Sequence, residues 1–189
     1  MLNRSVTRQD AVQLAVDMRL RLPEMAKKHP ATDSGRSEYT RAIWNYFDEN
    51  FQRKYGWTLY PDTEPKKGRV AGEFMTDFAL FDNKRGFRIA CESEWGDLDH
   101  IDWAFDKLRA VKAEIKILVF QRGHGSTDLL SEEVAKRIRP YLAKCGHHHA
   151  KHEFYLFIQF DGDNAKLFIW EPTEDGPFEV EQIEFDHLD

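Results

Sequence analysis

Three acidic residues, Asp77, Glu92 and Glu94, lie in two apolar segments that are typical of β-strands. The segments cover residues 70–81 and 87–95, and turn-forming residues separate them. Carboxylate oxygens are the ligands that hard divalent cations prefer. The first chemistry to consider is therefore metal binding by acids carried on neighbouring strands.

The short loop between these segments indicates how they pair. Residues 83–86, Asn-Lys-Arg-Gly, have the composition of a hairpin turn. A symmetric loop sets Asp82 opposite Phe87, and counting back along both strands sets Asp77 opposite Glu92. Directly opposed residues share a face of the sheet, with Cβ atoms about 4.5–5.5 Å apart. Glu94, two residues further on, falls on the same face, so we expect three carboxylates to converge.

Such a cluster is unfavourable without a cation. Opposed like charges destabilise a strand pair, and close carboxylates raise each other's pKa. A Mg²⁺ ion removes the conflict and usually keeps several of its waters. It also orients an attacking water and neutralises the charge that develops on a phosphodiester. The alternative interpretation is a solvated acidic strand face that performs no chemistry.

The other elements predict a mixed α/β domain. Helical periodicity indicates helices over residues 7–28, 37–55, 98–113 and 128–145. Apolar runs indicate strands over 115–120, 154–160 and 165–170, with weaker strands at 57–59 and 178–185. We expect an α/β fold with a mixed central sheet flanked by helices. One domain covers 1–189, divided into an N-terminal helix and linker (1–36), a core (37–160) and a C-terminal strand extension (161–189).

Composition excludes few functions. Hydrophobic residues make up 41% and charged residues 32% of the 189 positions, an ordinary globular balance. A net charge of −6 argues against a nonspecific nucleic-acid coat protein, which is normally basic. An enzyme with local basic contacts stays compatible with that charge. No segment has the length of a membrane span, and two cysteines are too few for a disulfide framework. We therefore expect a cytoplasmic protein with no membrane partner.

The two acidic segments resemble the motif of the PD-(D/E)xK nucleases. Residues 75–81 read Met-Thr-Asp-Phe-Ala-Leu-Phe and residues 89–95 read Ile-Ala-Cys-Glu-Ser-Glu-Trp. The family has an acid on one strand and an acid-x-Lys on the next, within a core of a helix, three strands, a helix and a strand. The resemblance covers roughly residues 37–160 and implies a restriction endonuclease-like core.

Glu94 departs from the family pattern, which usually has Lys at that position. Some type II restriction enzymes of the family carry Glu there and are active. Lys107, on the next predicted helix, is a candidate for a displaced ammonium group, although a lysine on an amphipathic helix is usually solvated. The family often carries a further acid on its first core helix. Glu38 is our choice for that acid, and Glu49 is the weaker alternative.

Other segments offer rival sites. Cys145 with the histidines at 147–149 and 152 allows a structural zinc site, although no second paired ligand lies near in sequence. The glycine-containing loop 122–126 can approach phosphate with its backbone amides. Two basic clusters, Lys66-Lys67-Arg69 and Lys84-Arg85-Arg88, can hold a nucleic-acid backbone. Each has a plain alternative as a polar loop or turn.

The resulting hypothesis is a metal-dependent nuclease that hydrolyses nucleic acid, with DNA favoured. By the resemblance, Asp77, Glu92 and the Ser93 carbonyl bind Mg²⁺, or Mn²⁺ in its place, Glu94 contacts the metal or orients the attacking water, and Glu38 supports the site. The family implies a setting in restriction, repair or defence against mobile DNA, and allows a homodimer. The rival hypothesis is a catalytically inactive module that uses the same fold to bind nucleic acid or a protein.

Overall fold

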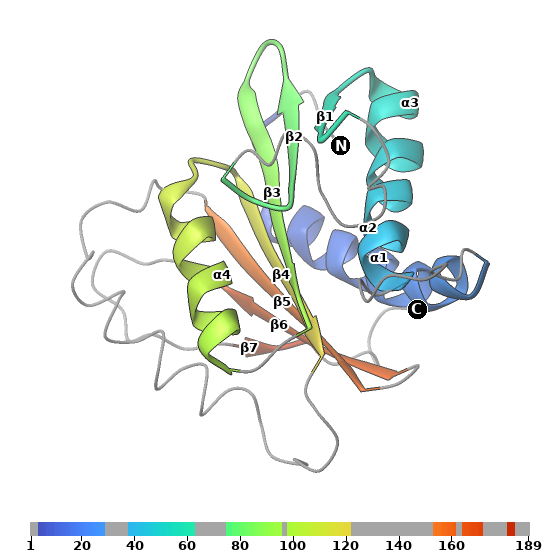
Figure 1. The fold of residues 1–189 in the computed structure, drawn as a ribbon. Coiled ribbons are helices and arrows are strands. Elements are labelled where there is room, and N and C mark those ends of the chain that lie inside the picture. The colour runs from blue at the N-terminus through green and yellow to red at the C-terminus, as the bar shows by residue number, and fades with distance from the viewer. Residues whose placement is uncertain are drawn as a thin grey trace.

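A mixed sheet of seven strands runs through the computed structural model, which describes residues 4–28, 38–62, 75–95, 98–121, 153–161, 164–171 and 181–183 (Figure 1). The strands follow chain order across the sheet: β1 (Thr58–Tyr60), β2 (Phe78–Asp82), β3 (Gly86–Glu94), β4 (Ile115–Gln121), β5 (Phe154–Asp161), β6 (Asn164–Trp170) and β7 (Glu181–Gln182). The helical segments are α1 (Arg8–Lys28), α2 (Glu38–Phe47), the π-helical η1 (Asp48–Gln52), α3 (Arg53–Tyr55) and α4 (Leu98–Ala110).

The type of pairing between neighbouring strands changes twice across the sheet. β1, β2 and β3 are antiparallel neighbours, β3, β4 and β5 run parallel, and β6 and β7 are antiparallel again. Parallel neighbours need a crossover connection, and α4 supplies the one between β3 and β4. The predicted α/β class with a mixed sheet flanked by helices is confirmed.

Helices cover both faces of the sheet. α1 and α2 pack on one face, against alternate strand residues such as Ile117 and Leu156. α4 packs on the other, where Phe105 and Leu108 meet Leu118 and the residues beside it. β4 is buried on both sides, because its apolar side chains serve both layers. Figure 1 shows α4 in front of the sheet, on the opposite side from α1 and α2.

The second predicted helix is real but irregular. α2, η1 and α3 follow one another without a break from residue 38 to 55, and Gly56 ends the run at φ 67°, in the left-handed region. Glycine adopts that conformation at little cost, so it is a natural helix stop. The π-helical turn was not predicted. There, the buried Asp48 carboxylate pairs with Arg53 at 2.6 Å.

The predicted hairpin register needs a correction at the turn. Asp82 pairs with Gly86 and not with Phe87, so the loop is one residue shorter than expected. The register then shifts between Leu80 and Phe81, and this irregularity restores the predicted alignment further along the strands. Phe78 therefore lies opposite Cys91, which sets Asp77 against Glu92 as the symmetric count required.

Several expected segments lie outside the described residues. They are the predicted helix 128–145, the loop 122–126, the cluster at Lys66, Lys67 and Arg69, and the histidines at 147–149 and 152. Among the helices that are described, none combines the length and apolar character needed to cross a membrane.

Candidate active site

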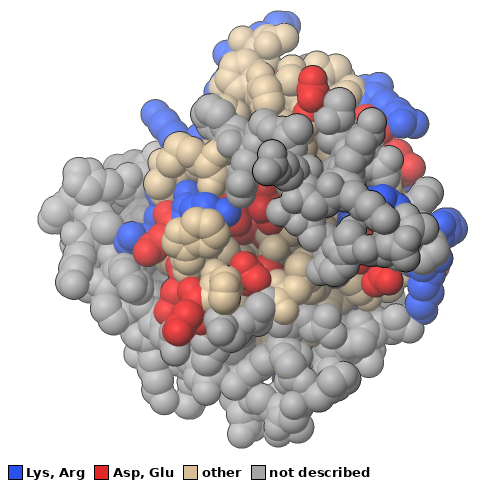
Figure 2. Space-filling model, in the orientation of Figure 1, with Lys and Arg blue, Asp and Glu red and all other residues tan. Residues whose placement is uncertain are grey.

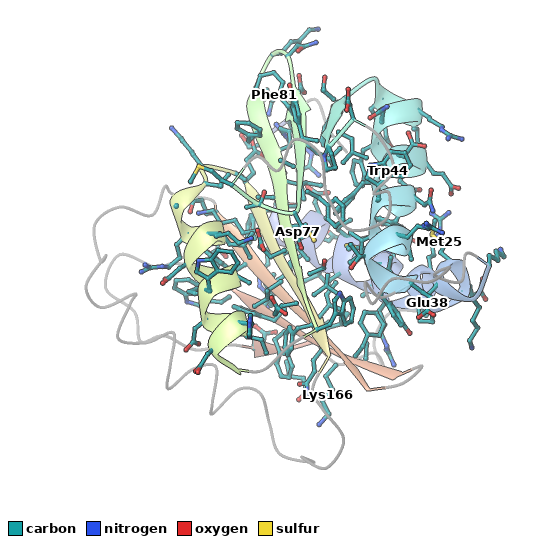
Figure 3. All side chains as sticks on the ribbon, viewed as in Figure 1. Met25, Glu38, Trp44, Asp77, Phe81 and Lys166 are labelled. Carbon is teal, nitrogen blue, oxygen red and sulfur yellow. The ribbon has the colours of Figure 1, made fainter. Side chains whose placement is uncertain are left out.

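Asp77 and Glu92 hold each other in place where the ladder between β2 and β3 ends. The Asp77 amide donates to Glu92 Oε1 at 3.0 Å. In return, Asp77 Oδ2 accepts the Ser93 amide at 2.9 Å and the Ser93 hydroxyl at 2.8 Å. Each side chain thus satisfies a backbone donor of the opposite strand. Figure 3 labels Asp77 in front of the two strands, near the middle of the view.

Glu92 is a buried carboxylate beside a second negative charge. Its exposed fraction is 2%. Burial, followed by the charge of Asp77, raises the pKa of Glu92 to about 8, although the contact with Lys107 and the Asp77 amide act in the opposite direction. A carboxyl group whose pKa lies near neutrality is characteristic of functional sites.

Lys107 of α4 reaches this carboxylate from across the helix–sheet interface. Its Nζ lies 2.6 Å from Glu92 Oε2, and its side chain is 16% exposed. The same ammonium lies 4.5 Å from the centre of the Trp103 ring, one helical turn earlier. The displaced ammonium considered from the sequence is therefore in direct contact with the acidic centre. In Figure 2, acidic side chains lie near the middle of this face of the molecule, with basic ones close by.

Ser93 ties the acidic centre to α2. Its hydroxyl lies 3.3 Å from the Thr40 hydroxyl, which also accepts the Trp95 indole N–H at 3.0 Å. The Tyr39 ring packs on that indole, with ring centres 5.4 Å apart. The first turn of α2 therefore reaches the end of β3 through Tyr39 and Thr40, and it supports the strand that carries Glu92.

Two predicted acids have different positions. Glu94 falls on the same sheet face as Glu92 by strand alternation, and its Oε1 accepts its neighbour's amide, that of Trp95, at 2.9 Å. Glu38 stands exposed at the start of α2, apart from Asp77 in the view of Figure 3. Within the described part of the chain, no group of three or more Asp, Glu, His or Cys side chains is placed to bind one ion. The contacts given above join two carboxylates and one ammonium group, with Glu94 two residues further along the same face of β3.

These donors still fit a hard divalent cation. Asp77 and Glu92 bring two negative charges, and Lys107 balances one of them. Mg²⁺ sites in proteins commonly use one or two carboxylates, with water and substrate phosphate completing the shell. Asp77, Glu92 and the Ser93 carbonyl are the residues that would hold it.

Of the three basic residues predicted as a cluster at the hairpin, Arg88 is buried and cannot contact nucleic acid. Arg88 has no exposed surface, pairs with Glu114 at 3.0 Å and donates to the Arg4 carbonyl. Its guanidinium also lies over the Trp57 ring at 5.5 Å. Arg88 is therefore part of the core beneath the N-terminal segment and does not face solvent. Lys84 and Arg85 remain at the turn surface.

Nucleophilic catalysis by Cys91 is not supported. The thiol is fully buried, and burial with the nearby Asp77 and Glu92 charges raises its pKa well above the usual value. A protonated, inaccessible thiol is unreactive.

Sequence reasoning missed Thr40 and Trp103. Thr40 lies two residues after the predicted Glu38, but only the packing of α2 on β3 shows which residue of that turn faces the site. Trp103 is 60% exposed on α4, and its spacing of four residues from Lys107 was the available signal.

Comparisons with known proteins give no direct guide. No family model matches the chain, and no curated protein matches it either.

Proposed function

We propose that this chain is a metal-dependent nuclease of the PD-(D/E)xK kind, in which Lys107 of α4 replaces the lysine that the motif usually has at position 94. The observation that carries the proposal is the contact of Lys107 Nζ with Glu92 Oε2 at 2.6 Å, beside Asp77. An ammonium and two carboxylates converge there from three elements. These are the chemical groups that the family motif combines.

The order of elements supports the same proposal. A helix, α2, precedes three antiparallel strands, β1 to β3. A further helix, α4, then leads to β4, which runs parallel to β3. This succession supports a restriction endonuclease-like core, in which Asp77, directly before β2, and Glu92 on β3 would be the acids of the motif.

Each residue has a distinct part in phosphodiester hydrolysis. Asp77 and Glu92 would hold the divalent ion, with the Ser93 carbonyl beside them. The ion supplies charge neutralisation at the phosphate and a more acidic bound water. Lys107 holds Glu92 in place and provides a positive charge next to the reacting phosphate. Glu94, on the same sheet face, is the candidate to orient the attacking water. DNA is the favoured substrate by resemblance.

Cleavage of plasmid and single-stranded DNA with Mg²⁺ or Mn²⁺ tests the proposal. The wild type is compared with Asp77→Asn and with Asp82→Asn, a matched change at the far end of β2, at the hairpin turn, where Asp82 accepts the Lys84 amide. We expect Asp77→Asn to lose activity by about 100-fold or more, and Asp82→Asn to keep it.

Two results would contradict the proposal. Full activity in Asp77→Asn would remove the acidic centre from the mechanism. A folded wild type that cleaves none of a varied panel of DNA and RNA substrates would favour the inactive binding module instead.

A further inference from the structure

Two large apolar side chains near Asp77 and Lys107 in the sequence are exposed. Trp103 on α4 is 60% exposed and Met75, two residues before Asp77, is 51% exposed. Met75 also has a positive φ of 49°, which is uncommon for a residue other than glycine. Single exposed apolar residues are ordinary on protein surfaces, so their exposure alone indicates nothing. What distinguishes Trp103 is its contact with Lys107, whose ammonium pairs with Glu92 of the proposed active site.

Trp103 is connected to that site by Lys107. The lysine Nζ lies 4.5 Å from the indole ring centre and 2.6 Å from Glu92 Oε2. The cation covers part of the ring and fixes it through a cation–π contact. The ring is therefore a positioned surface adjacent to the reacting groups, and most of it faces solvent.

The charges around Trp103 determine what it can bind. Asp99 and Asp106 lie four residues before and three residues after it, so they share its strip of helix surface, and Asp102 adjoins it. Cations lie there too, because Lys107 adjoins the ring and Asp106 pairs with Arg109 at 2.9 Å. The exposed indole offers an uncharged aromatic surface, and nucleobases stack on aromatic side chains irrespective of their sequence. The ring therefore suits the base of a nucleotide, and the ammonium of Lys107 beside it suits the phosphate.

We infer that Trp103 is a stacking platform for an unpaired nucleobase next to the scissile phosphate, so that the substrate is single-stranded or locally opened nucleic acid. This inference rests on the proposed nuclease function. It adds to it the form of the substrate, because bases within a duplex stack on one another and do not offer a face to a side chain. Duplex DNA is then a poorer substrate than a single strand of the same sequence.

Binding without cleavage tests the platform. The probe is a fluorescein-labelled oligothymidylate of about 12 nucleotides, in EDTA, and its fluorescence anisotropy gives the dissociation constant. A second oligonucleotide of equal length carries abasic residues throughout, so it has the same phosphates and no bases. The variants are Trp103→Ala, Trp103→Phe and Leu20→Ala, the last a control because Leu20 on α1 is 63% exposed and distant in sequence from the site.

We expect Trp103→Ala to weaken oligothymidylate binding about tenfold, and Trp103→Phe to restore most of it. Neither variant should change the affinity for the abasic oligonucleotide, and Leu20→Ala should match the wild type on both. Equal affinities of wild type and Trp103→Ala for oligothymidylate would overturn the inference. So would a wild type that binds the two oligonucleotides equally, or binds neither.

The two proposals fail separately. Metal-dependent cleavage that is lost in Asp77→Asn, with no effect of Trp103→Ala on binding, leaves the nuclease and removes the platform. Base-dependent binding through Trp103 in a protein that cleaves nothing leaves the platform and removes the nuclease.

Discussion

Two lysine–glutamate pairs lie on the α4 side of the sheet, and their surroundings differ. Lys116 and Glu153 meet at 2.8 Å, with side chains 2% and 7% exposed, and Lys116 also donates to the Tyr155 hydroxyl at 3.0 Å. Lys107 and Glu92 meet at 2.6 Å, with the lysine 16% exposed. The geometry of contact is almost the same in both pairs.

Charge balance separates them. The first pair has one positive and one negative group in the core, and burial lowers the pKa of Lys116 while Glu153 raises it. In the second pair Asp77 adds a further negative charge, and the pKa of Glu92 rises to about 8. We therefore assign the enclosed pair of Lys116 and Glu153, whose charges cancel, a structural role. A pair with excess negative charge and a route to solvent is suited to accept a cation, which is why we assign the chemistry to Glu92.

The largest expected effect on stability comes from the enclosed pair. Lys116→Met leaves the Glu153 carboxylate buried without its ammonium, so the free energy of unfolding should fall by about 3 kcal/mol. Chemical denaturation measures it. Lys116→Met with Glu153→Leu should lose less than the single variant, because both charges are then absent. Cleavage per folded molecule should stay at the wild-type level in both. A single variant as stable as the wild type would show that the pair contributes nothing.

The open pair should show the reverse pattern. Lys107→Met removes the ammonium beside the phosphate, and we expect the single-turnover cleavage rate to fall about 100-fold. Its free energy of unfolding at pH 7 should change little, because the raised pKa of Glu92, about 8, keeps this carboxyl mostly protonated there, so that no buried charge is left without its partner. Lys107→Arg should recover part of the rate. An unchanged rate in Lys107→Met would assign this lysine to stability alone.

The raised pKa of Glu92 predicts how stability varies with pH in the absence of metal. The titratable groups that interact with the Glu92 carboxyl are Asp77, Lys107 and Cys91. Between the unperturbed pKa of 4.5 and the folded value of about 8, the native state holds a proton that the unfolded chain has lost. The contribution of Glu92 to the free energy of unfolding is therefore fully present below pH 4.5 and is lost as the pH rises through about 8.

Denaturation of wild type and Glu92→Gln across this pH range isolates the contribution. The wild type should lose stability relative to the variant as the pH rises, and saturating Mn²⁺ should reduce that loss because the ion stabilises the carboxylate form. Parallel curves for the two proteins without metal would show that the pKa of Glu92 is not raised.

Sequence reasoning was most effective where one physical pattern dominates. An apolar run predicted the strand that is β4, and helical periodicity predicted the helix that is α4, where Ile101, Phe105 and Leu108 are buried. The facing of Asp77 and Glu92 was predicted correctly for an incomplete reason. The turn is asymmetric, and an irregularity at Leu80–Phe81 compensates for it. No local sequence pattern predicts the register shift between Leu80 and Phe81.

The contacts that assemble the site were harder to foresee because they depend on packing between elements. Burial of Leu108 sets Lys107 at the edge of the α4 interface, but the side of the helix on which β3 lies is a tertiary property. The same holds for α2. A first-turn acid, Glu38, was chosen from the family pattern, whereas the turn touches the site through Thr40, whose hydroxyl meets Ser93 and Trp95.

The smallest expected effect distinguishes these two residues of α2. Thr40→Val keeps the shape of the side chain but removes the hydroxyl that links Ser93 to Trp95. One lost hydrogen bond corresponds to about 1 kcal/mol, so we expect a cleavage rate about fivefold lower through looser positioning of the strand that carries Glu92. Glu38→Gln should change the rate less than twofold, since Glu38 is exposed and surface changes of this kind are usually minor.

The comparison requires saturating metal and single-turnover conditions, with Thr40→Ser as the control that keeps the hydroxyl. Recovery in Thr40→Ser would assign the effect to the hydrogen bond and not to packing. A larger effect of Glu38→Gln than of Thr40→Val would mean that the first-turn acid supports the site as the family resemblance implies, and that α2 approaches the acidic centre more closely during catalysis than it does here.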